Sequence, residues 1–244
     1  MRIYIVSHKM VRFPKLSNLY MPLQVGTAIN GKLQGDWSYD SEGDNISEKN
    51  GSFNELTGMY WIWKNSTEDI VGFCHYRRFF VTFAGKIENL FFGRKCNYLT
   101  KEDVERMLLK NDVIVHNRTY FKGSCRKQFK QTQKHPEDID LLQQIISDKY
   151  PDYVDACKRV FNGSSSHLLN VLIARKKVFD DYCEWLFDIL FSVESILYEK
   201  GETEFDRRMG MLGERLLDVW ILKNELKVKE CFMINTERTD WKLW

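Results

Sequence analysis

A cluster of basic side chains follows a short apolar segment near the end of the first third of the chain. The segment 71–74 leads directly into His75-Tyr-Arg-Arg78, and two phenylalanines follow. A guanidinium group stays charged, and its planar set of donors matches a phosphate or a carboxylate. The aromatic flanks indicate burial, and a buried arginine requires an anionic partner. The segment therefore predicts one of two things, a site for an anionic ligand or a structural ion pair.

Short polar side chains lie just before a predicted helix. Asn45, Ser47 and Asn50 offer donors and acceptors that suit sugar hydroxyls or the edge of a nucleobase, and the helix N-terminus that follows favours anions. Trp61 and Trp63 have faces on which a sugar or base can stack, although aromatic residues at helical spacing more often belong to a core. We interpret this region as one side of a ligand pocket.

A glycine-rich segment in the last sixth of the chain carries a carboxylate. Gly210 and Gly213 interrupt a helical pattern, which indicates close packing or a break, and Glu214 follows the second glycine directly. A carboxylate at such a predicted helix start can act as a general base. The alternative is a structural glutamate that pairs with an arginine or with the helix dipole.

These side chains need a scaffold, and apolar β-branched segments alternate with helical patterns in the first half of the chain. Polar clusters follow three predicted strands, at His8-Lys9, at His75–Arg78 and at 116–118. Ligands of α/β sheets bind where strands end and loops begin. The predicted strands are 2–6, 69–74, 112–116 and 228–234, with a strand or buried segment at 167–174. The pattern predicts an α/β core with helical additions.

Helix signals and loops complete the predicted organisation. Ser52-x-x-Glu55 and Thr100-x-x-Asp103 have the form of capping boxes, and residues 10–51 are expected to be irregular and functional. Two long helices are expected at 176–200 and 204–223. We expect one domain, 1–244, in which residues 1–120 form the α/β unit and residues 121–244 are mostly helical.

Composition restricts the classes of partner. Net charge is +2 for 244 residues, and no apolar run reaches the length of a membrane-spanning helix. Residues 122–134 hold five basic side chains and no acid, which suits an anionic membrane surface; no nucleic-acid recognition motif accompanies them. The six cysteines form no CxxC pair. We expect a cytoplasmic protein that contacts no nucleic acid and rests peripherally on the inner face of the membrane.

Several of these segments together are similar to one bacterial family. Asn45-Ile-Ser-x-x-Asn50, Glu55-Leu-Thr-Gly-x-Tyr-Trp-Ile-Trp-Lys-Asn65 and Gly72-x-Cys-His-Tyr-Arg-Arg78 resemble a family long known only as a domain of unknown function, and so do 184–190 and 208–216. Members of that family are regarded as glycosyltransferases of capsular polysaccharide or exopolysaccharide synthesis with a GT-A-like fold. The resemblance covers nearly the whole chain.

The resemblance implies a hexosyltransferase with a GT-A-like nucleotide-sugar-binding sheet. The donor is expected to be a uridine diphosphate (UDP) sugar, with a hexose such as galactose in pyranose or furanose form. The acceptor is expected to be a lipid-linked oligosaccharide of capsule, exopolysaccharide or lipopolysaccharide O-antigen synthesis. The expected roles are catalysis for Glu214 and His75; donor binding for His8, Lys9, Asn45, Ser47, Asn50, Glu55, Arg77 and Arg78; and an acceptor or sugar pocket of Tyr60, Trp63, Asn170 and Arg208.

The metal question stays open in the sequence. Most GT-A enzymes hold Mg²⁺ or Mn²⁺ with an Asp-x-Asp at a strand end, but His75–Arg78 occupies the comparable place here, and Asp138-Ile-Asp140 has a helical context. Either the arginines neutralise the diphosphate in place of a metal, or His75 binds a metal or protonates the leaving phosphate. Two other functions are considered: an inactive carbohydrate- or nucleotide-binding protein, and a phosphotransferase that uses the arginines.

Overall fold

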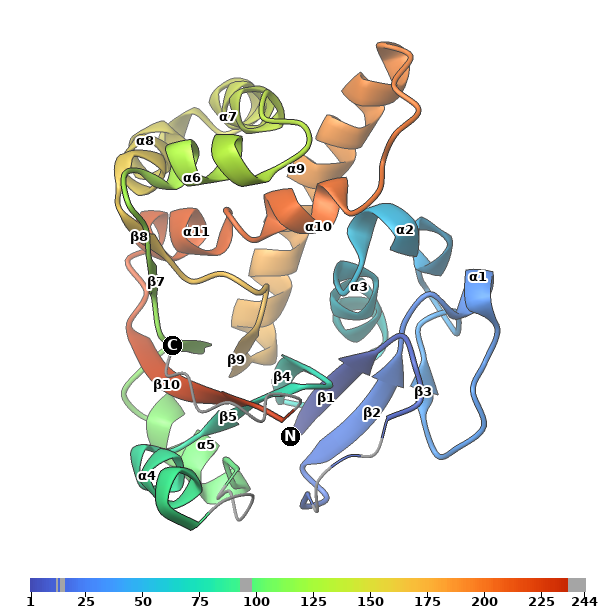
Figure 1. Ribbon diagram of the computed structural model, residues 1–244, viewed down its shortest axis with the longest axis vertical. Coiled ribbons are helices and arrows are strands. Elements are labelled where there is room, and N and C mark those ends of the chain that lie inside the picture. The colour runs from blue at the N-terminus through green and yellow to red at the C-terminus, as the bar shows by residue number, and fades with distance from the viewer. Residues whose placement is uncertain (12, 14–15, 93–97, 237–244) are drawn as a thin grey trace.

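The computed structural model describes residues 1–11, 13, 16–92 and 98–236, and of residues 88–92 only the backbone (Figure 1). Within these residues a mixed eight-stranded sheet has the order β3-β2-β1-β4-β5-β10-β6-β9. Its strands are β1 (Arg2–Ser7), β2 (Tyr20–Gln24), β3 (Ser38–Tyr39), β4 (Ile70–His75), β5 (Arg78–Val81), β6 (Val113–His116), β9 (Leu172–Arg175) and β10 (Val228–Asn235). A separate pair is formed by β7 (Thr119–Tyr120) and β8 (Ser165–Ser166).

The parallel part of the sheet brings three strand ends to one edge. β1 lies between β2 and β4 and is parallel to both, with Ser7 opposite Gln24 and Val6 opposite His75. β1 and β4 are apolar and almost fully buried, as parallel strands covered on both faces usually are. The residues that follow β1, β2 and β4 therefore lie near one another, where α/β sheets bind ligands.

β3 pairs parallel with β2, and the strands β5, β6, β9 and β10 lie on the other side of β4. Ile70–Phe73 pairs antiparallel with β9, whereas His75 pairs with Arg78, so that Tyr76 and Arg77 form a two-residue turn into β5. β10 pairs antiparallel with β5 and parallel with β6, and β6 pairs antiparallel with β9. Gly72 permits this packing: a Cβ there would lie 2.8 Å from the side chain of Ile3 and 2.9 Å from that of Ile173.

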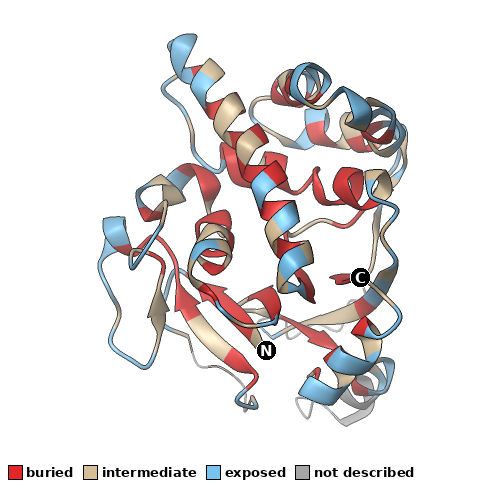
Figure 2. Ribbon diagram, turned by 180° about the vertical axis from the view of Figure 1, so that it is seen from behind, coloured by how far each residue is buried: buried red, intermediate tan, exposed pale blue. Residues whose placement is uncertain are grey.

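Helices surround the sheet. They are α1 (Thr27–Asn30), η1 (Ser47–Lys49), α2 (Asn50–Phe53), α3 (Leu56–Asn65), α4 (Phe83–Phe92), α5 (Lys101–Leu108), α6 (Cys125–Thr132), α7 (Asp138–Lys149), η2 (Pro151–Tyr153), α8 (Val154–Asn162), α9 (Lys176–Glu199), α10 (Arg208–Gly213) and α11 (Leu217–Lys223). α9 packs against α3, β4 and β9, and its outward side is exposed in Figure 2. α6, α7 and α8 pack on one another (Figure 1), and α7 also packs against α9 and α8 against α11.

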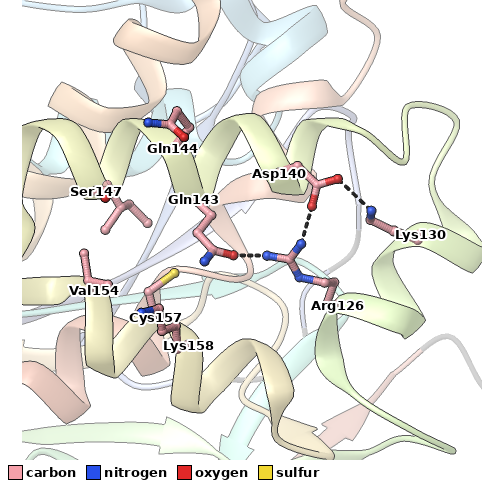
Figure 3. Close-up of a pocket in the computed structure, with 10 residues that line it drawn as sticks. Arg126, Lys130, Asp140, Gln143, Gln144, Ser147, Val154, Cys157 and Lys158 are labelled. Carbon is pink, nitrogen blue, oxygen red and sulfur yellow. Dashed lines mark hydrogen bonds and ion pairs between the residues drawn. The ribbon is translucent and has the colours of Figure 1, made fainter.

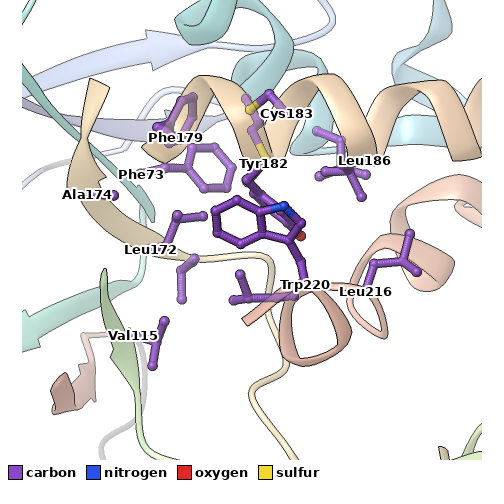
Figure 4. Packing of buried hydrophobic residues seen from close by; sticks show 14 of the residues in the cluster. Phe73, Val115, Leu172, Ala174, Phe179, Tyr182, Cys183, Leu186, Leu216 and Trp220 are labelled. Atoms are coloured by element: carbon purple, nitrogen blue, oxygen red, sulfur yellow. The ribbon is translucent and has the colours of Figure 1, made fainter. Parts of the chain in front are cut away.

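The core lies between the sheet and α9. Phe73, Leu172 and Ala174 of the sheet face Phe179 and Tyr182 of α9 (Figure 4), and all five are at most 1% exposed. Trp220 of α11 closes this layer, with its ring centroid 5.2 Å from that of Tyr182. Burial of Phe73, Leu172 and Phe179 stabilises the fold by about 1.5–3 kcal/mol each. The core thus fixes α9 and α11 on the sheet that carries the candidate site.

Some local predictions are confirmed and others are wrong. Thr100 and Asp103 form the predicted capping box of α5. The second predicted box is wrong, because Asn54 adopts a φ of 50° and divides the segment into α2 and α3, with Ser52 inside α2. Residues 10–51 are not irregular throughout, since they contain β2, α1, β3 and η1.

The second half of the chain adds strands as well as helices. The helix expected at 176–200 is α9, but the one expected at 204–223 is two helices, because the chain leaves α10 after Gly213 and α11 begins at Leu217. β8, β9 and β10 also come from this half. The sheet therefore draws on both halves of the chain that we distinguished in the sequence.

Candidate functional site

A single buried tyrosine supports the basic side chains at the ends of β1 and β4. Tyr76 is 5% exposed, and its ring centroid lies 5.6 Å from that of His8 and 4.2 Å from that of His75. The Lys9 Nζ and the Arg77 guanidinium carbon lie 5.0 and 5.6 Å from the same centroid. An aromatic face stabilises cations at such distances. The predicted clusters His8-Lys9 and His75–Arg78 therefore meet around one ring, where Lys9 and Arg77 supply positive charge.

The protonation of His75 reports the charge around it. Burial, followed by the positive charges of Arg77 and Arg78 and then of His8 and Arg207, lowers the pKa of His75 to about 3. Its buried Nδ1 has no hydrogen-bond partner among the residues that the structure describes. His75 is therefore neutral at pH 7, and its surroundings favour an anion.

Two carboxyl groups from distant parts of the chain lie within this field. Glu55 precedes α3, and Glu214 follows α10 and is 8% exposed. Burial, together with the charge of Glu55, raises the pKa of Glu214 to about 7, against the opposing effects of Arg215 and Arg78. Burial also raises the pKa of Glu55, although Asn170, Arg207 and Arg78 favour its ionised form. Such a pair suits acid–base chemistry near neutral pH.

Glycines allow α10 to approach α2 and α3 closely (Figure 1). A Cβ on Gly210 would lie 3.0 Å from Asn54 Nδ2 and 3.2 Å from the Phe53 carbonyl oxygen, and one on Gly213 would lie 2.8 Å from Leu56 Cδ1. Larger residues would push α10 away. The two glycines that the sequence singled out therefore bring Glu214 near Glu55. The prediction of a helix start at Glu214 is wrong, since Glu214 is the residue after α10.

A turn at residues 169–170 contacts both carboxyl groups. The Leu169 N–H donates to Glu214 Oε1 at 3.1 Å. Asn170 Nδ2 donates to Glu55 Oε1 at 3.0 Å and to the Gly210 carbonyl oxygen at 3.1 Å. Asn170 thus lies in the same group as Glu55, Glu214 and the basic side chains.

The asparagines and the serine predicted for the donor pocket hold loops together. Asn45 Nδ2 donates to the carbonyl oxygens of Ser41 and Gly43. Asn50 Nδ2 donates to the Asn54 carbonyl oxygen and to Thr57 Oγ1. Ser47 is fully buried. These side chains shape the chain between β3 and α3, next to Glu55.

Asp40 is the centre of this loop network. It is fully buried, and its carboxylate accepts hydrogen bonds from the N–H groups of Gly26 and Thr27 and from the hydroxyls of Thr27, Ser47 and Thr57. The loop after β2 is thereby tied to η1 and α3. Asp40 has no recognisable motif around it and was not predicted.

We expect that Asp40→Ala lowers the free energy of unfolding by roughly 3–4 kcal/mol, because several buried donors lose their acceptor. Urea unfolding followed by circular dichroism measures this effect. Asp36→Ala serves as the control and should change stability little, because Asp36 is an exposed aspartate four residues before Asp40. Equal unfolding midpoints for the two variants would contradict the role of Asp40.

The other three residues predicted for an acceptor pocket lie in packed surroundings. Tyr60 and Trp63 contact Phe187 of α9, with ring centroids 5.1 and 5.8 Å apart, and the Trp63 pair is stacked. Arg208 is 4% exposed and forms a bidentate ion pair with Asp138 at 2.5 and 2.7 Å. These interactions hold Tyr60 and Trp63 against α9 and link α10 to α7 through Arg208.

The Asp-x-Asp letters at 138–140 do not fit a metal site. Asp138 is held by Arg208, and Asp140 forms ion pairs with Arg126 and Lys130 (Figure 3). Within the described part of the chain, no three His, Cys, Asp or Glu side chains gather as metal ligands. The groups at the end of β4 are mainly cationic donors, which do not fit a divalent ion either.

The basic segment 122–134 is partly neutralised by acids from outside it. Arg126 and Lys130 form ion pairs with Asp140, and Lys134 forms an ion pair with Glu204. Arg126, Lys130 and Asp140 line a surface pocket of about 480 Å³ between α6, α7 and α8 (Figure 3). These ion pairs reduce the positive charge that the segment presents to a surface.

Sequence reasoning missed two residues of the group. Arg207 adopts a φ of 58° just before α10, its N–H donates to the Gly51 carbonyl oxygen at 2.8 Å, and its charge acts on both Glu55 and His75. Tyr76 supports the cations. The consecutive arginines at 207–208 resemble those at 77–78, and this similarity could have indicated a role for Arg207. In the sequence, only its aromatic character distinguished Tyr76.

Comparison with known proteins places the chain in a family. The family described as "Domain of unknown function (DUF4422)" matches residues 2–225. The chain belongs to the DUF4422 family. A search of curated proteins finds no match. Among solved structures, the DUF4422 chain is similar to an apo structure of WbbM, a bifunctional glycosyltransferase, with 28% identity and a TM-score of 0.80.

The similarity has defined bounds. It covers 97% of the DUF4422 chain but 45% of WbbM, so this chain spans less than half the length of that protein. The resemblance to a family of unknown function, and a mixed sheet with flanking helices like that of a glycosyltransferase, are thus confirmed. None of the helices that the structure describes is both long and apolar enough to cross a bilayer.

Proposed function

We propose that the chain is a glycosyltransferase that moves a sugar from a nucleotide diphosphate sugar to a hydroxyl group. The observation that carries this proposal is the juxtaposition of a positive cluster at the ends of β1 and β4 with two carboxyl groups of raised pKa, Glu55 and Glu214. Positive charge is needed to bind a diphosphate, and a carboxylate is needed to remove a proton from a hydroxyl. The similarity to part of a bifunctional glycosyltransferase supports the same chemistry.

The proposed step assigns one role to each group. Glu214 in its ionised form accepts the proton of the acceptor hydroxyl, whose oxygen forms a bond to the anomeric carbon of the sugar. The bond between that carbon and the diphosphate oxygen breaks, and the nucleoside diphosphate leaves with its electron pair. Arg77 and Arg78, with His8 and Lys9, stabilise the charge that develops on the leaving group. This assignment inverts the configuration at the anomeric carbon.

The basic cluster replaces a metal in this proposal. Guanidinium groups fixed by the Tyr76 support and the β4–β5 turn need no reorganisation when the diphosphate leaves. His75, neutral at pH 7, is proposed to form a hydrogen bond with the donor and not to protonate it. Transfer is therefore expected without added Mg²⁺ or Mn²⁺, and an assay with and without these ions and with a chelator measures this.

The finer assignments extend the same proposal. The donor is proposed to be a UDP-linked hexose such as galactose in pyranose or furanose form, bound in a GT-A-like sheet. The acceptor is proposed to be a lipid-linked oligosaccharide of capsule, exopolysaccharide or O-antigen synthesis, at the cytoplasmic face of the membrane. In that case the segment 122–134 faces the lipid surface with the charges that its ion pairs leave. Asn45, Ser47 and Asn50 are proposed to shape the loop on the donor side of Glu55.

Donor binding tests the proposal directly. At a UDP concentration 100 times its Kd, folding is stabilised by about 2.7 kcal/mol, and Tm should rise by roughly 5–10 °C for a chain of this size. Arg77→Gln should reduce that rise by half or more, whereas Arg159→Gln, an exposed arginine of α8, should leave it unchanged. Equal protection of both variants would remove Arg77 from the donor site.

Product analysis distinguishes the rival functions. A transferase yields a glycosylated acceptor and a nucleoside diphosphate, whereas a phosphotransferase yields a phosphorylated acceptor. Binding of UDP sugars with no transfer or donor hydrolysis, with or without metal ions, would leave a binding protein as the function. A panel of UDP-hexoses with synthetic lipid-linked acceptors, read by mass spectrometry, separates all three.

A further inference from the structure

Two consecutive residues at the site have left-handed backbone conformations. Leu169 has a φ of 78° and Asn170 a φ of 50°. Residues other than glycine rarely adopt this conformation, and leucine has no side-chain hydrogen bond with which to offset the steric cost. Such conformations persist where the surroundings impose them, and they gather at functional sites.

The contacts of this turn show what the conformation achieves. Within two residues the chain donates one hydrogen bond to Glu214, from the Leu169 N–H, and one to Glu55, from the Asn170 side chain, at 3.1 and 3.0 Å. With an extended backbone, successive residues would point to opposite sides. The left-handed pair therefore lets adjacent residues reach two carboxyl groups that approach from α3 and α10.

The orientation of the Asn170 amide is fixed. Both hydrogens of Nδ2 are used, by Glu55 Oε1 and by the Gly210 carbonyl oxygen, and the side chain is 1% exposed. A flipped amide would set its oxygen against two acceptors. The remaining Oδ1 lies beside Gly213, where a Cβ would be 3.2 Å away, and it has no partner in the described part of the chain. The Asn170 amide thus acts on Glu55 and on α10.

We infer that the Leu169–Asn170 turn is a positioning device that holds Glu55 and Glu214 as one coupled carboxyl pair. This inference rests on the proposed function for its catalytic meaning. Two carboxyl groups in one buried site do not ionise independently, and the pair titrates in two steps that belong to both. Asn170, placed with the acceptor pocket on sequence grounds, is here a positioning residue, and Glu55 is the second carboxyl of the acid–base pair.

The charges around the pair are known. Arg78 acts on both carboxyl groups, Arg207 acts on Glu55, and Arg215 acts on Glu214. All three are cations that favour ionisation, whereas burial and the mutual repulsion of the pair oppose it. The hydrogen bonds from the turn favour the ionised form too. Loss of the Asn170 donor should therefore shift the titration of the pair to higher pH.

The test uses Asn170→Asp and Asn170→Gly. Aspartate and glycine both tolerate a left-handed φ, but aspartate places a third carboxyl group against Glu55, and glycine removes the donor without adding charge. We expect Asn170→Asp to move the acid limb of the kcat/KM profile up by about one pH unit and to lower the plateau about 100-fold. Asn170→Gly should shift the limb in the same direction by less.

A second readout does not depend on activity. Carboxyl titration followed by ¹³C NMR of glutamate-labelled protein should show an upward shift of the pair in both variants, smaller in Asn170→Gly than in Asn170→Asp. Asn111→Asp is the matched control, because the Asn111 amide also donates to a backbone carbonyl oxygen, that of Met107 at 2.8 Å, but lies just after α5 and far from the pair in sequence. That control should leave both readouts unchanged.

The outcomes separate the inference from the proposed function. Carboxyl titrations equal to wild type in folded Asn170→Asp or Asn170→Gly overturn the inference, even where wild type transfers sugar. If the variants shift the titration but the wild-type protein transfers no sugar, the result supports the positioning role and contradicts the proposed function. Because glycine adds no charge, Asn170→Gly keeps the test decisive if the aspartate variant does not fold.

Discussion

Glu214→Gln is expected to lower kcat of sugar transfer by about 10³-fold, because glutamine cannot accept the proton of the acceptor hydroxyl. The pH dependence of wild-type kcat/KM should reflect the ionisation of Glu214. Its pKa is raised to about 7 by burial and by the charge of Glu55. The ionised, active form therefore increases as pH rises, so kcat/KM should climb between about pH 6 and 8 and then level off. Initial rates over that range measure this.

The same substitution should make the protein more stable at alkaline pH. The pKa of Glu214 is raised in the folded state above the value of about 4.3 for an unfolded glutamate, so the folded state binds more protons between these two values. The stability that the protonated group contributes is complete below about pH 4 and is lost as pH rises through 7. At pH 8 the glutamine variant should therefore be more stable than wild type by roughly 2–3 kcal/mol, with little difference at pH 4.5.

Loss of activity together with a gain of stability distinguishes a catalytic glutamate from a structural one. If Glu214 only paired structurally with an arginine, its replacement would lower both the activity and the stability of the protein. Glu199→Gln, at the exposed end of α9, is the control, and it should change neither quantity. Transfer by Glu214→Gln at more than a tenth of the wild-type rate would show that another group is the base.

The sequence was informative where the chemistry of the site is local. Apolar segments that end in His8-Lys9 and His75–Arg78 predicted two basic strand ends, and parallel pairing of β1 with β4 places them together. The glycine pair before Glu214 predicted close packing, because a glycine inside a helical pattern needs a reason. In both cases, neighbouring residues in the sequence contain the physical cause.

Long-range partners explain what could not be predicted. The basic segment 122–134 has no acid of its own, yet Asp140 and Glu204 neutralise some of its charge after folding. Asp40 and Arg207 gain their roles from segments that are remote in the chain. The false capping box at Ser52 fails because Asn54 turns the chain to receive α10, and that demand comes from tertiary packing.

The second large effect is expected for Arg78, whose charge acts on three titratable groups of the site. It favours the ionised forms of Glu55 and Glu214 and lowers the pKa of His75. Arg78→Gln should therefore lower kcat by about 10²–10³-fold through lost stabilisation of the leaving diphosphate. It should also move the acid limb of the pH profile upward, because the pKa of Glu214 loses one of the charges that hold it down.

Arg78→Lys separates charge from geometry. Lysine keeps the positive charge but lacks the planar fork of donors, so the acid limb should return toward its wild-type position while kcat recovers incompletely. Arg159→Gln, on the exposed side of α8, controls for the loss of an arginine as such. A normal kcat and an unshifted acid limb of the pH profile in Arg78→Gln would show that the basic cluster takes no part in catalysis. The β4–β5 turn would then be a structural feature of the sheet, and the anion site would have to lie elsewhere.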